Sequence, residues 1–145
     1  MPRPVGRRLA RMETTDPQKL RMLVVEDDEL IRKLVIAYFA QGPYEFFEAE
    51  DGQEALKSAL ENTPDVVITD LMLPRLTGAA LIKTLRQMHD FATIPIVAIT
   101  AGTEELQAQA KQAGANVVLT KPLRAAVVIK TVEELLSLTP FLRRR

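Results

Sequence analysis

Short aliphatic runs that end at a polar residue constrain the fold of this chain more than any other feature. Residues 66–69 (Val-Val-Ile-Thr) are β-branched or aliphatic and end at Asp70. Such a run is typical of a short strand buried on both faces of a parallel sheet. Three other runs end in the same way: 23–25 at Glu26, Asp27 and Asp28, 96–99 at Thr100, and 116–120 at Lys121. Because the carboxyl ends of parallel strands lie along one edge of a sheet, these side chains are predicted to converge on Asp70.

Helical patterns alternate with the predicted strands along the chain. Strands are predicted at 21–25, 44–49, 66–69, 94–99 and 116–120, and helices follow from near Asp28, from Gly52, within 81–88, at 104–113 and at 123–138. Five alternations of this kind favour an α/β fold, a doubly wound parallel sheet with helices on both faces and right-handed crossovers.

Two of the helical patterns make specific predictions. Asp28 is positioned to cap the first helix, and four apolar residues of that helix recur at the spacing of one face: Ile31, Leu34, Val35 and Tyr38. The segment 104–113 is helical by propensity, but its apolar residues are nearly all alanine apart from Leu106. A helix of this composition buries little apolar surface, so it is predicted to be the easiest to shift.

Length and composition indicate one domain with an aliphatic core. The chain has 145 residues, of which 47% are hydrophobic and 5% aromatic. It has no cysteine, which excludes disulfides, thiolate metal sites and thiol nucleophiles. No apolar run approaches the ~20 residues that span a bilayer, and no signal-peptide pattern follows the basic N-terminus. These features predict a cytoplasmic protein without membrane insertion.

The net charge is zero, but the charges are unevenly distributed: both ends of the chain are basic and the residues between them are acidic. Residues 1–21 carry six basic and two acidic residues, residues 22–138 carry ten basic and seventeen acidic residues, and 143–145 are three arginines. We interpret 1–20 as a flexible basic extension, 21–138 as the folded domain and 139–145 as a basic tail. The alternative is a weak attraction of the basic ends to nucleic acid or to an acidic partner.

Three carboxylates at one edge of a sheet need a compensating cation. If Glu26, Asp27 and Asp70 meet, each disfavours the charge of the others. A divalent cation resolves this, and an all-oxygen site suits Mg²⁺, which completes its coordination with water and phosphate oxygens. A carboxylate held there can act as a nucleophile toward phosphorus, with Lys121 and Thr100 available to contact phosphoryl oxygens. The alternative is a salt-bridged acidic edge with Lys121 as its counter-ion.

A pattern of four segments extends over most of the chain: 22–28 (Met-Leu-Val-Val-Glu-Asp-Asp), 67–74 (Val-Ile-Thr-Asp-Leu-Met-Leu-Pro) with Gly78, 96–101 (Ile-Val-Ala-Ile-Thr-Ala) and 120–122 (Thr-Lys-Pro). In this order they resemble the receiver domain of two-component response regulators over residues 21–138. One such segment would support the resemblance only weakly, but four segments that match in the same order support it strongly. The resemblance suggests a stand-alone, single-domain response regulator.

The resemblance implies a flavodoxin-like fold with strand order 2-1-3-4-5, in which Asp70 is the phosphoacceptor. The phosphoryl group would come from a sensor histidine kinase or a histidine phosphotransfer protein, and the domain would catalyse only its own phosphorylation and dephosphorylation. Thr100 and Lys121 would contact the phosphoryl group, and the Lys121–Pro122 peptide bond would be cis. The implied ligands of Mg²⁺ are Glu26, Asp27, Asp70 and the main-chain carbonyl of Met72.

Two departures from the family pattern bear on switching. Where the family often has an aromatic residue that moves inward with the threonine, this chain has Val118. Either Thr100 and the backbone alone drive the switch, or its coupling to the surface is weaker. The variable positions two beyond Asp70 and Thr100 hold Met72 and Gly102, neither of which can orient a water by its side chain. We therefore predict a long-lived phosphoryl group.

Phosphorylation is expected to bias a two-state element that a partner protein reads. The expected output face comprises helix 104–113, strand 116–120 and helix 123–138, and it is also a candidate homodimer contact. No DNA-binding helix-turn-helix or enzymatic domain follows in the sequence. The expected output is therefore contact with a downstream protein, or phosphoryl relay.

Three rival interpretations stay open. A haloacid-dehalogenase-like hydrolase also uses an aspartate nucleophile, but it needs a second acid two residues later, where Met72 stands. A phosphorylation-independent scaffold of the same fold would be expected to lack Asp70, Lys121 or the acid pair, all of which are present. The third is a receiver fragment of a larger hybrid kinase or transcription factor.

Overall fold

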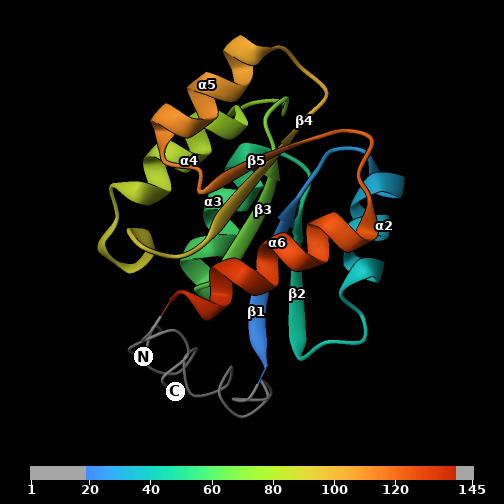
Figure 1. Ribbon diagram of the computed structural model, residues 1–145. Coiled ribbons are helices and arrows are strands. Elements are labelled where there is room, and N and C mark those ends of the chain that lie inside the picture. The colour runs from blue at the N-terminus through green and yellow to red at the C-terminus, as the bar shows by residue number, and fades with distance from the viewer. Residues whose placement is uncertain (1–18, 140–145) are drawn as a thin grey trace, which may run out of the picture.

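A five-stranded parallel sheet forms the centre of the molecule in a computed structural model, which describes residues 19–139 (Figure 1). The strands are β1 (Leu20–Val25), β2 (Tyr44–Ala49), β3 (Val66–Asp70), β4 (Ile96–Thr100) and β5 (Val117–Thr120). They lie in the order β2-β1-β3-β4-β5, and each neighbouring pair is parallel. The predicted flavodoxin-like fold and its strand order are confirmed.

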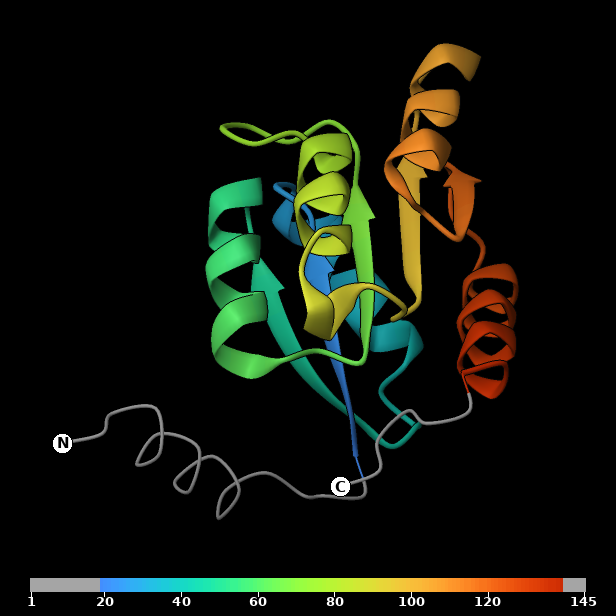
Figure 2. The same cartoon turned by 90° about the vertical axis from the view of Figure 1, so that its left-hand side faces the viewer.

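Helices cover both faces of this sheet (Figures 1 and 2). Their bounds are α2 (Glu29–Tyr38), α3 (Gly52–Asn62), α4 (Gly78–Arg86), α5 (Glu104–Ala113) and α6 (Ala125–Ser137), with a short 3₁₀ helix, η1 (His89–Phe91), after α4. The buried hydrophobic residues of α3, α4 and α5 belong to one core, and those of α2 and α6 belong to the other. Within residues 19–139, none of these helices combines the length and hydropathy that a membrane span requires.

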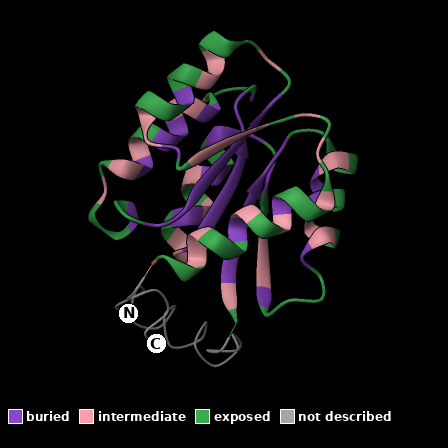
Figure 3. Cartoon of the chain, viewed as in Figure 1, coloured by how far each residue is buried: buried purple, intermediate pink, exposed green. Residues whose placement is uncertain are grey.

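The strands supply alternate side chains to the two cores. In β1, Leu23 and Val25 face the core under α3, α4 and α5, whereas Met22 and Val24 face α2 and α6. Every residue of β3 and of β4 is buried (Figure 3). These two central strands therefore hold their last residues at the sheet edge on a rigid support.

Side-chain caps fix where four of the helices begin. Asp28 accepts a hydrogen bond from the N–H of Ile31 at the start of α2, as the sequence predicts. Asp51, Thr77 and Thr103 cap α3, α4 and α5 in the same way. Because each of these helices follows a strand, its N-terminus lies at the edge of the sheet where the strands have their carboxyl ends. Open α/β sheets bind ligands at this edge.

The predicted inner face of α2 is confirmed for Ile31, Val35 and Tyr38, which pack against the core, but not for its fourth residue. Leu34, which was expected on the apolar face, is 48% exposed, whereas Arg32 points inward and is 6% exposed. Some bounds also differ: β1 begins at Leu20, inside the predicted extension, and α6 begins at Ala125 rather than at residue 123. The rest of the predicted basic extension and nearly all of the basic tail lie outside the described residues.

Helix α5 has the thin apolar face that its composition predicts. Ala110 is the one buried residue within its range, and Leu106 is partly buried against the core. The C-terminal end is held by Arg86 of α4, whose Nε donates to the carbonyl of Gly114 at 3.0 Å. The N-terminal end follows Gly102 at the edge of the sheet where the predicted site residues gather.

Candidate functional site

The structure brings the three predicted acids together at the carboxyl edge of the sheet. β1 and β3 are neighbours, with Val25 opposite Thr69, so Glu26 and Asp70 are the next residues along these two adjacent segments. Carboxylate oxygens of Glu26, Asp27 and Asp70 lie within 4.8 Å of one another. Glu26 and Asp70 are buried and Asp27 is exposed, so the cluster opens to solvent on the side of Asp27.

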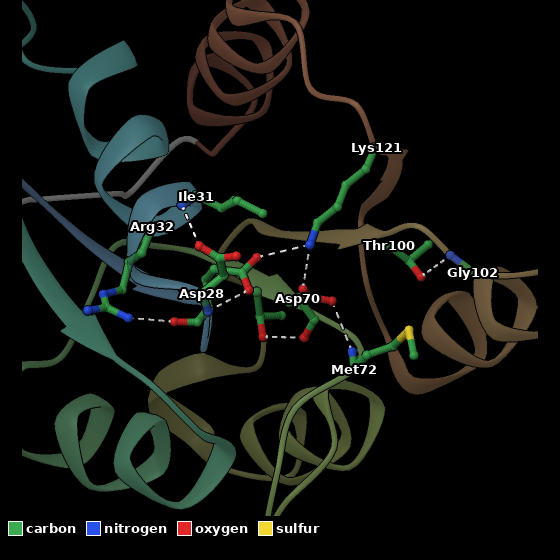
Figure 4. Close-up of polar contacts among 10 residues, drawn as sticks. Asp28, Ile31, Arg32, Asp70, Met72, Thr100, Gly102 and Lys121 are labelled. Carbon is green, nitrogen blue, oxygen red and sulfur yellow. Dashed lines mark hydrogen bonds and ion pairs between the residues drawn. The ribbon is translucent and has the colours of Figure 1, made fainter.

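Lys121 reaches the same cluster from the loop after β5 (Figure 4). Its Nζ donates to Asp70 Oδ2 at 2.8 Å and to Glu26 Oε1 at 3.1 Å. Its backbone N–H donates to the carbonyl of Thr100 at 2.9 Å, and the Lys121–Pro122 peptide bond is cis. One ammonium group thus joins acids that two different strands supply.

Thr100 lies beside Asp70, but its hydroxyl is bonded elsewhere. In the register of β3 and β4, Asp70 pairs with Ile99, so Thr100 is the next residue along the edge. Its buried Oγ1 accepts a hydrogen bond from the N–H of Gly102 at 2.8 Å (Figure 4). Within the described chain it makes no hydrogen bond to Asp70 or Lys121. Because a hydroxyl can donate while it accepts, the proton of Thr100 Oγ1 stays available to a phosphoryl oxygen.

Both oxygens of the Asp70 carboxylate have a partner. Oδ2 faces Lys121, and Oδ1 accepts a hydrogen bond from the N–H of Met72 at 3.0 Å. Gly78 approaches so closely that a Cβ there would lie 2.2 Å from the carbonyl oxygen of Asp70. The side chain of Met72 is 59% exposed, and the role of its main-chain carbonyl as a metal ligand stays a prediction.

The electrostatics of the cluster show a deficit of positive charge. The pKa of Glu26 is raised to about 7, mainly by burial and also by a hydrogen bond with Asp70 and the charge of Asp70, which together outweigh the opposing N–H of Asp28 and amine of Lys121. Burial alone would lower the pKa of Lys121, but its contacts with Asp70 and Glu26 outweigh this and raise it. One lysine therefore does not compensate the acids fully.

The donor set fits a hard divalent cation. All three clustered groups are carboxylates, and carboxylate and water oxygens are the ligands that Mg²⁺ prefers. A divalent cation would also relieve the repulsion that raises the pKa of Glu26. The acidic cluster is therefore typical of a magnesium site.

Two contacts in the loop after β1 were not anticipated from the sequence. The N–H of Asp28 donates to Glu26 Oε2 at 3.1 Å, and Nη1 of Arg32 donates to the carbonyl oxygen of Glu26 at 2.7 Å. For Asp28 the sequence indicated only the helix cap. For Arg32 the sequence shows only a charged residue within the largely apolar helical segment 31–38. Such a residue is as readily exposed as buried in a contact.

The sequence matches a known family over most of its length. Residues 22–133 match the family described as response regulator receiver domain. This chain belongs to that family. A receiver domain is a signalling module of two-component systems rather than a conventional enzyme, and its acidic pocket is consistent with a phosphoacceptor site.

This receiver domain is similar to curated relatives and to solved structures. It is 39% identical to the regulatory protein VanRB of Enterococcus faecalis over 118 residues, which cover 81% of this chain and 52% of VanRB. It is 35% identical to the transcriptional regulatory protein ResD of Bacillus subtilis over 126 residues, which cover 86% of this chain and 50% of ResD. The structure of the chemotaxis response regulator CheY4 of Vibrio cholerae aligns with a TM-score of 0.75 at 30% identity, covering 81% of this chain and 98% of that one. The chain spans about half the length of the curated relatives it matches.

Proposed function

We propose that Asp70 of this receiver domain accepts a phosphoryl group from the phosphohistidine of a sensor histidine kinase or a histidine phosphotransfer protein. The observation that carries the proposal is the surroundings of Asp70, whose carboxylate lies within 4.8 Å of two further acids and 2.8 Å from the amine of Lys121. Lys121 contacts both Glu26 and Asp70, but its single charge can balance only one of them. Three carboxylates around one lysine leave a negative surplus that suits a divalent cation.

The transfer forms one bond and breaks one. A carboxylate oxygen of Asp70 bonds to phosphorus as the bond from phosphorus to the imidazole nitrogen of the donor breaks. The imidazole keeps the bonding electron pair and takes up a proton. Lys121 would then contact one phosphoryl oxygen, and Thr100 would turn its hydroxyl toward another.

Glu26, Asp27 and Asp70 would hold Mg²⁺, and the proposal adds the main-chain carbonyl of Met72. When bound, Mg²⁺ neutralises negative charge on the transferred phosphoryl group. The buried carboxylate of Glu26 fixes one side of this set, and the exposed carboxylate of Asp27 leaves the other side open to the donor.

Intact-mass measurement after addition of acetyl phosphate and MgCl₂ tests the proposal. We expect one added phosphate on the wild type and none on Asp70→Ala. Asp90→Ala, which removes an exposed acid of η1, is the control and should gain phosphate as the wild type does. A wild type that gains no phosphate would support the phosphorylation-independent scaffold. Rapid consumption of the donor without an adduct would support a hydrolase.

The output is proposed to be protein contact through α5, β5 and α6. Thr100 Oγ1 accepts from the N–H of Gly102, so a movement of Thr100 toward a phosphoryl oxygen would also displace Gly102, and α5 follows directly. Because α5 buries so little, its rearrangement loses little packing. Val127 of α6 is 46% exposed, and Val118 and Leu119 of β5 are half-buried. These residues offer an apolar surface beside α5 to a downstream protein or to a second copy of the chain.

A further inference from the structure

A buried arginine lies next to the acid cluster without belonging to it. Arg32 is on the inner face of α2, and its side chain is 7% exposed. Burying a guanidinium is unfavourable unless its donors are paired. Its Nε donates to Glu48 Oε1 at 2.7 Å, and its Nη1 donates to the carbonyl oxygen of Glu26 at 2.7 Å. Figure 4 shows the guanidinium of Arg32 beside the start of α2, on the far side of the site from Lys121.

The peptide after Glu26 needs such a donor because the chain turns there. In an extended strand, successive side chains point to opposite faces. Glu26 and Asp27 are consecutive, yet their carboxylates come within 4.8 Å of each other and of Asp70. The backbone therefore leaves strand geometry at this peptide. The N–H of Glu26 still donates to Ala49 of β2 at 3.0 Å, but the carbonyl of Glu26 is bound by Arg32.

Glu48 holds the guanidinium of Arg32 in place. It lies on the edge strand β2, and its second oxygen, Oε2, accepts from Lys33 at 2.8 Å. The hydrogen bond from Lys33, and to a lesser extent the one from Arg32, lower the pKa of Glu48 below its ordinary value. Glu48 therefore stays charged. Its charge compensates that of Arg32, which would otherwise oppose a cation bound at the neighbouring acids.

We infer that Arg32 is a positioning residue, which holds the turned peptide that lets Glu26 and Asp27 reach one cation. This inference rests on the proposed function, because it takes these acids to be the ligands of Mg²⁺. Among the described residues, the hydrogen bonds of Arg32 go to Glu48 and to the carbonyl of Glu26, and none goes to a carboxylate of the acid cluster. Arg32 acts through the backbone of a ligand, in the way that outer-shell hydrogen bonds orient metal ligands.

Calorimetric titration of the full chain with MgCl₂, without a phosphodonor, tests the inference. We expect Arg32→Met, which keeps the apolar stem but loses both hydrogen bonds, to raise the Mg²⁺ dissociation constant about 10- to 100-fold. Arg32→Lys keeps the charge but cannot span Glu48 and Glu26 together, so it should recover only part of the affinity. Lys33→Met is the matched control, because it removes the other partner of Glu48 without touching Glu26. Its Mg²⁺ dissociation constant should equal that of the wild type.

A merely structural role for Arg32 gives a different result. Loss of packing alone would lower the denaturation midpoint of Arg32→Met and leave its Mg²⁺ dissociation constant unchanged, and that outcome overturns the inference. If Arg32→Met does not fold, Arg32→Lys and Glu48→Gln carry the test, and wild-type affinity in both overturns it equally. A wild type that binds Mg²⁺ while the Arg32 variants bind it as tightly contradicts this inference alone. A wild type that binds no Mg²⁺ contradicts the proposed function as well.

Discussion

At the scale of single residues, Glu26 should make the unfolding free energy depend on pH. Burial, and then Asp70, raise its pKa from 4.5 to about 7 in the folded protein without metal. Between these values the folded state holds a proton that the unfolded chain has lost, so this group's contribution to the unfolding free energy should fall as the pH rises. Denaturant titrations across that range should show the wild type losing stability relative to Glu26→Gln. A difference between the two proteins that stays constant with pH would contradict the assignment.

The same proton links the binding of Mg²⁺ to pH. A carboxylate must be ionised to serve as a ligand, so binding should expel the proton of Glu26 below about pH 7. The affinity for Mg²⁺ should therefore rise with pH up to this value and level off above it. Calorimetry in two buffers that differ in ionisation enthalpy measures the protons released. Release of no protons on the acid side would show that Glu26 is not a ligand.

Met72 and Gly102 bear on the lifetime of the phosphorylated state. Met72 is 59% exposed and has no polar group that could orient a water, and Gly102 has no side chain at all. We predict a long-lived phosphoryl group on Asp70, and we expect Met72→Gln, which adds an amide beside it, to shorten the lifetime. A phosphate-release time course checks both. Loss of phosphate from the wild type within seconds would contradict the prediction.

At the scale of the elements, strand ends were easier to predict than helix faces. The strands that deliver Asp70 and Thr100 are buried on both sides, so their continuous apolar runs mark where each one stops. On the inner face of α2, Ile31, Val35 and Tyr38 pack against the core as predicted, but Leu34 was predicted wrongly, because apolar periodicity reports burial in a hydrocarbon core. Apolar periodicity carries no information about the turned peptide at Glu26, which requires a hydrogen-bond donor. Arg32 supplies this donor and is therefore buried, whereas Leu34 is exposed. The need for this donor arises from a contact between α2 and the loop after β1, so it gives no periodic pattern in the sequence.

Arg86 is expected to set the stability of the end of α5 that lies away from the site. Its guanidinium donates to the carbonyls of Phe91, Ile94 and Gly114 and to the side chain of Asn116. Arg86→Met takes the guanidinium donor from these carbonyls, although Asn116 Oδ1 still accepts from the N–H of Ile96. The loss should lower the unfolding free energy by about 2–4 kcal/mol. Hydrogen exchange should accelerate more in α5 than in α3, because α5 has little buried surface to retain it. Lys83→Met, an exposed change on α4, is the control, and an equal acceleration in every helix would argue against a local anchor.

For the whole molecule, the order of the strands was not readable from composition or periodicity. These patterns predict five alternating elements, but many arrangements of five parallel strands satisfy them. The resemblance to receiver domains supplied the order, and the register of β1 with β3 then brings Glu26 beside Asp70. The contact between Lys121 and Glu26 joins residues 95 positions apart, which no local pattern can show.

The same long-range assembly makes the site a property of the folded state. Glu26 and Asp27 follow β1 and Asp70 ends β3, so the unfolded chain does not present the three acids together. A ligand that binds only the folded state raises the unfolding free energy by RT ln(1 + [L]/Kd), about 2.7 kcal/mol when Mg²⁺ is at 100 times its dissociation constant. Denaturant titration with MgCl₂ should show this gain in the wild type and lose most of it in Asp27→Asn. NaCl at matched ionic strength controls for screening of the acidic body. An equal gain with NaCl would mean that the acids respond to ionic strength in general rather than to a cation that they bind.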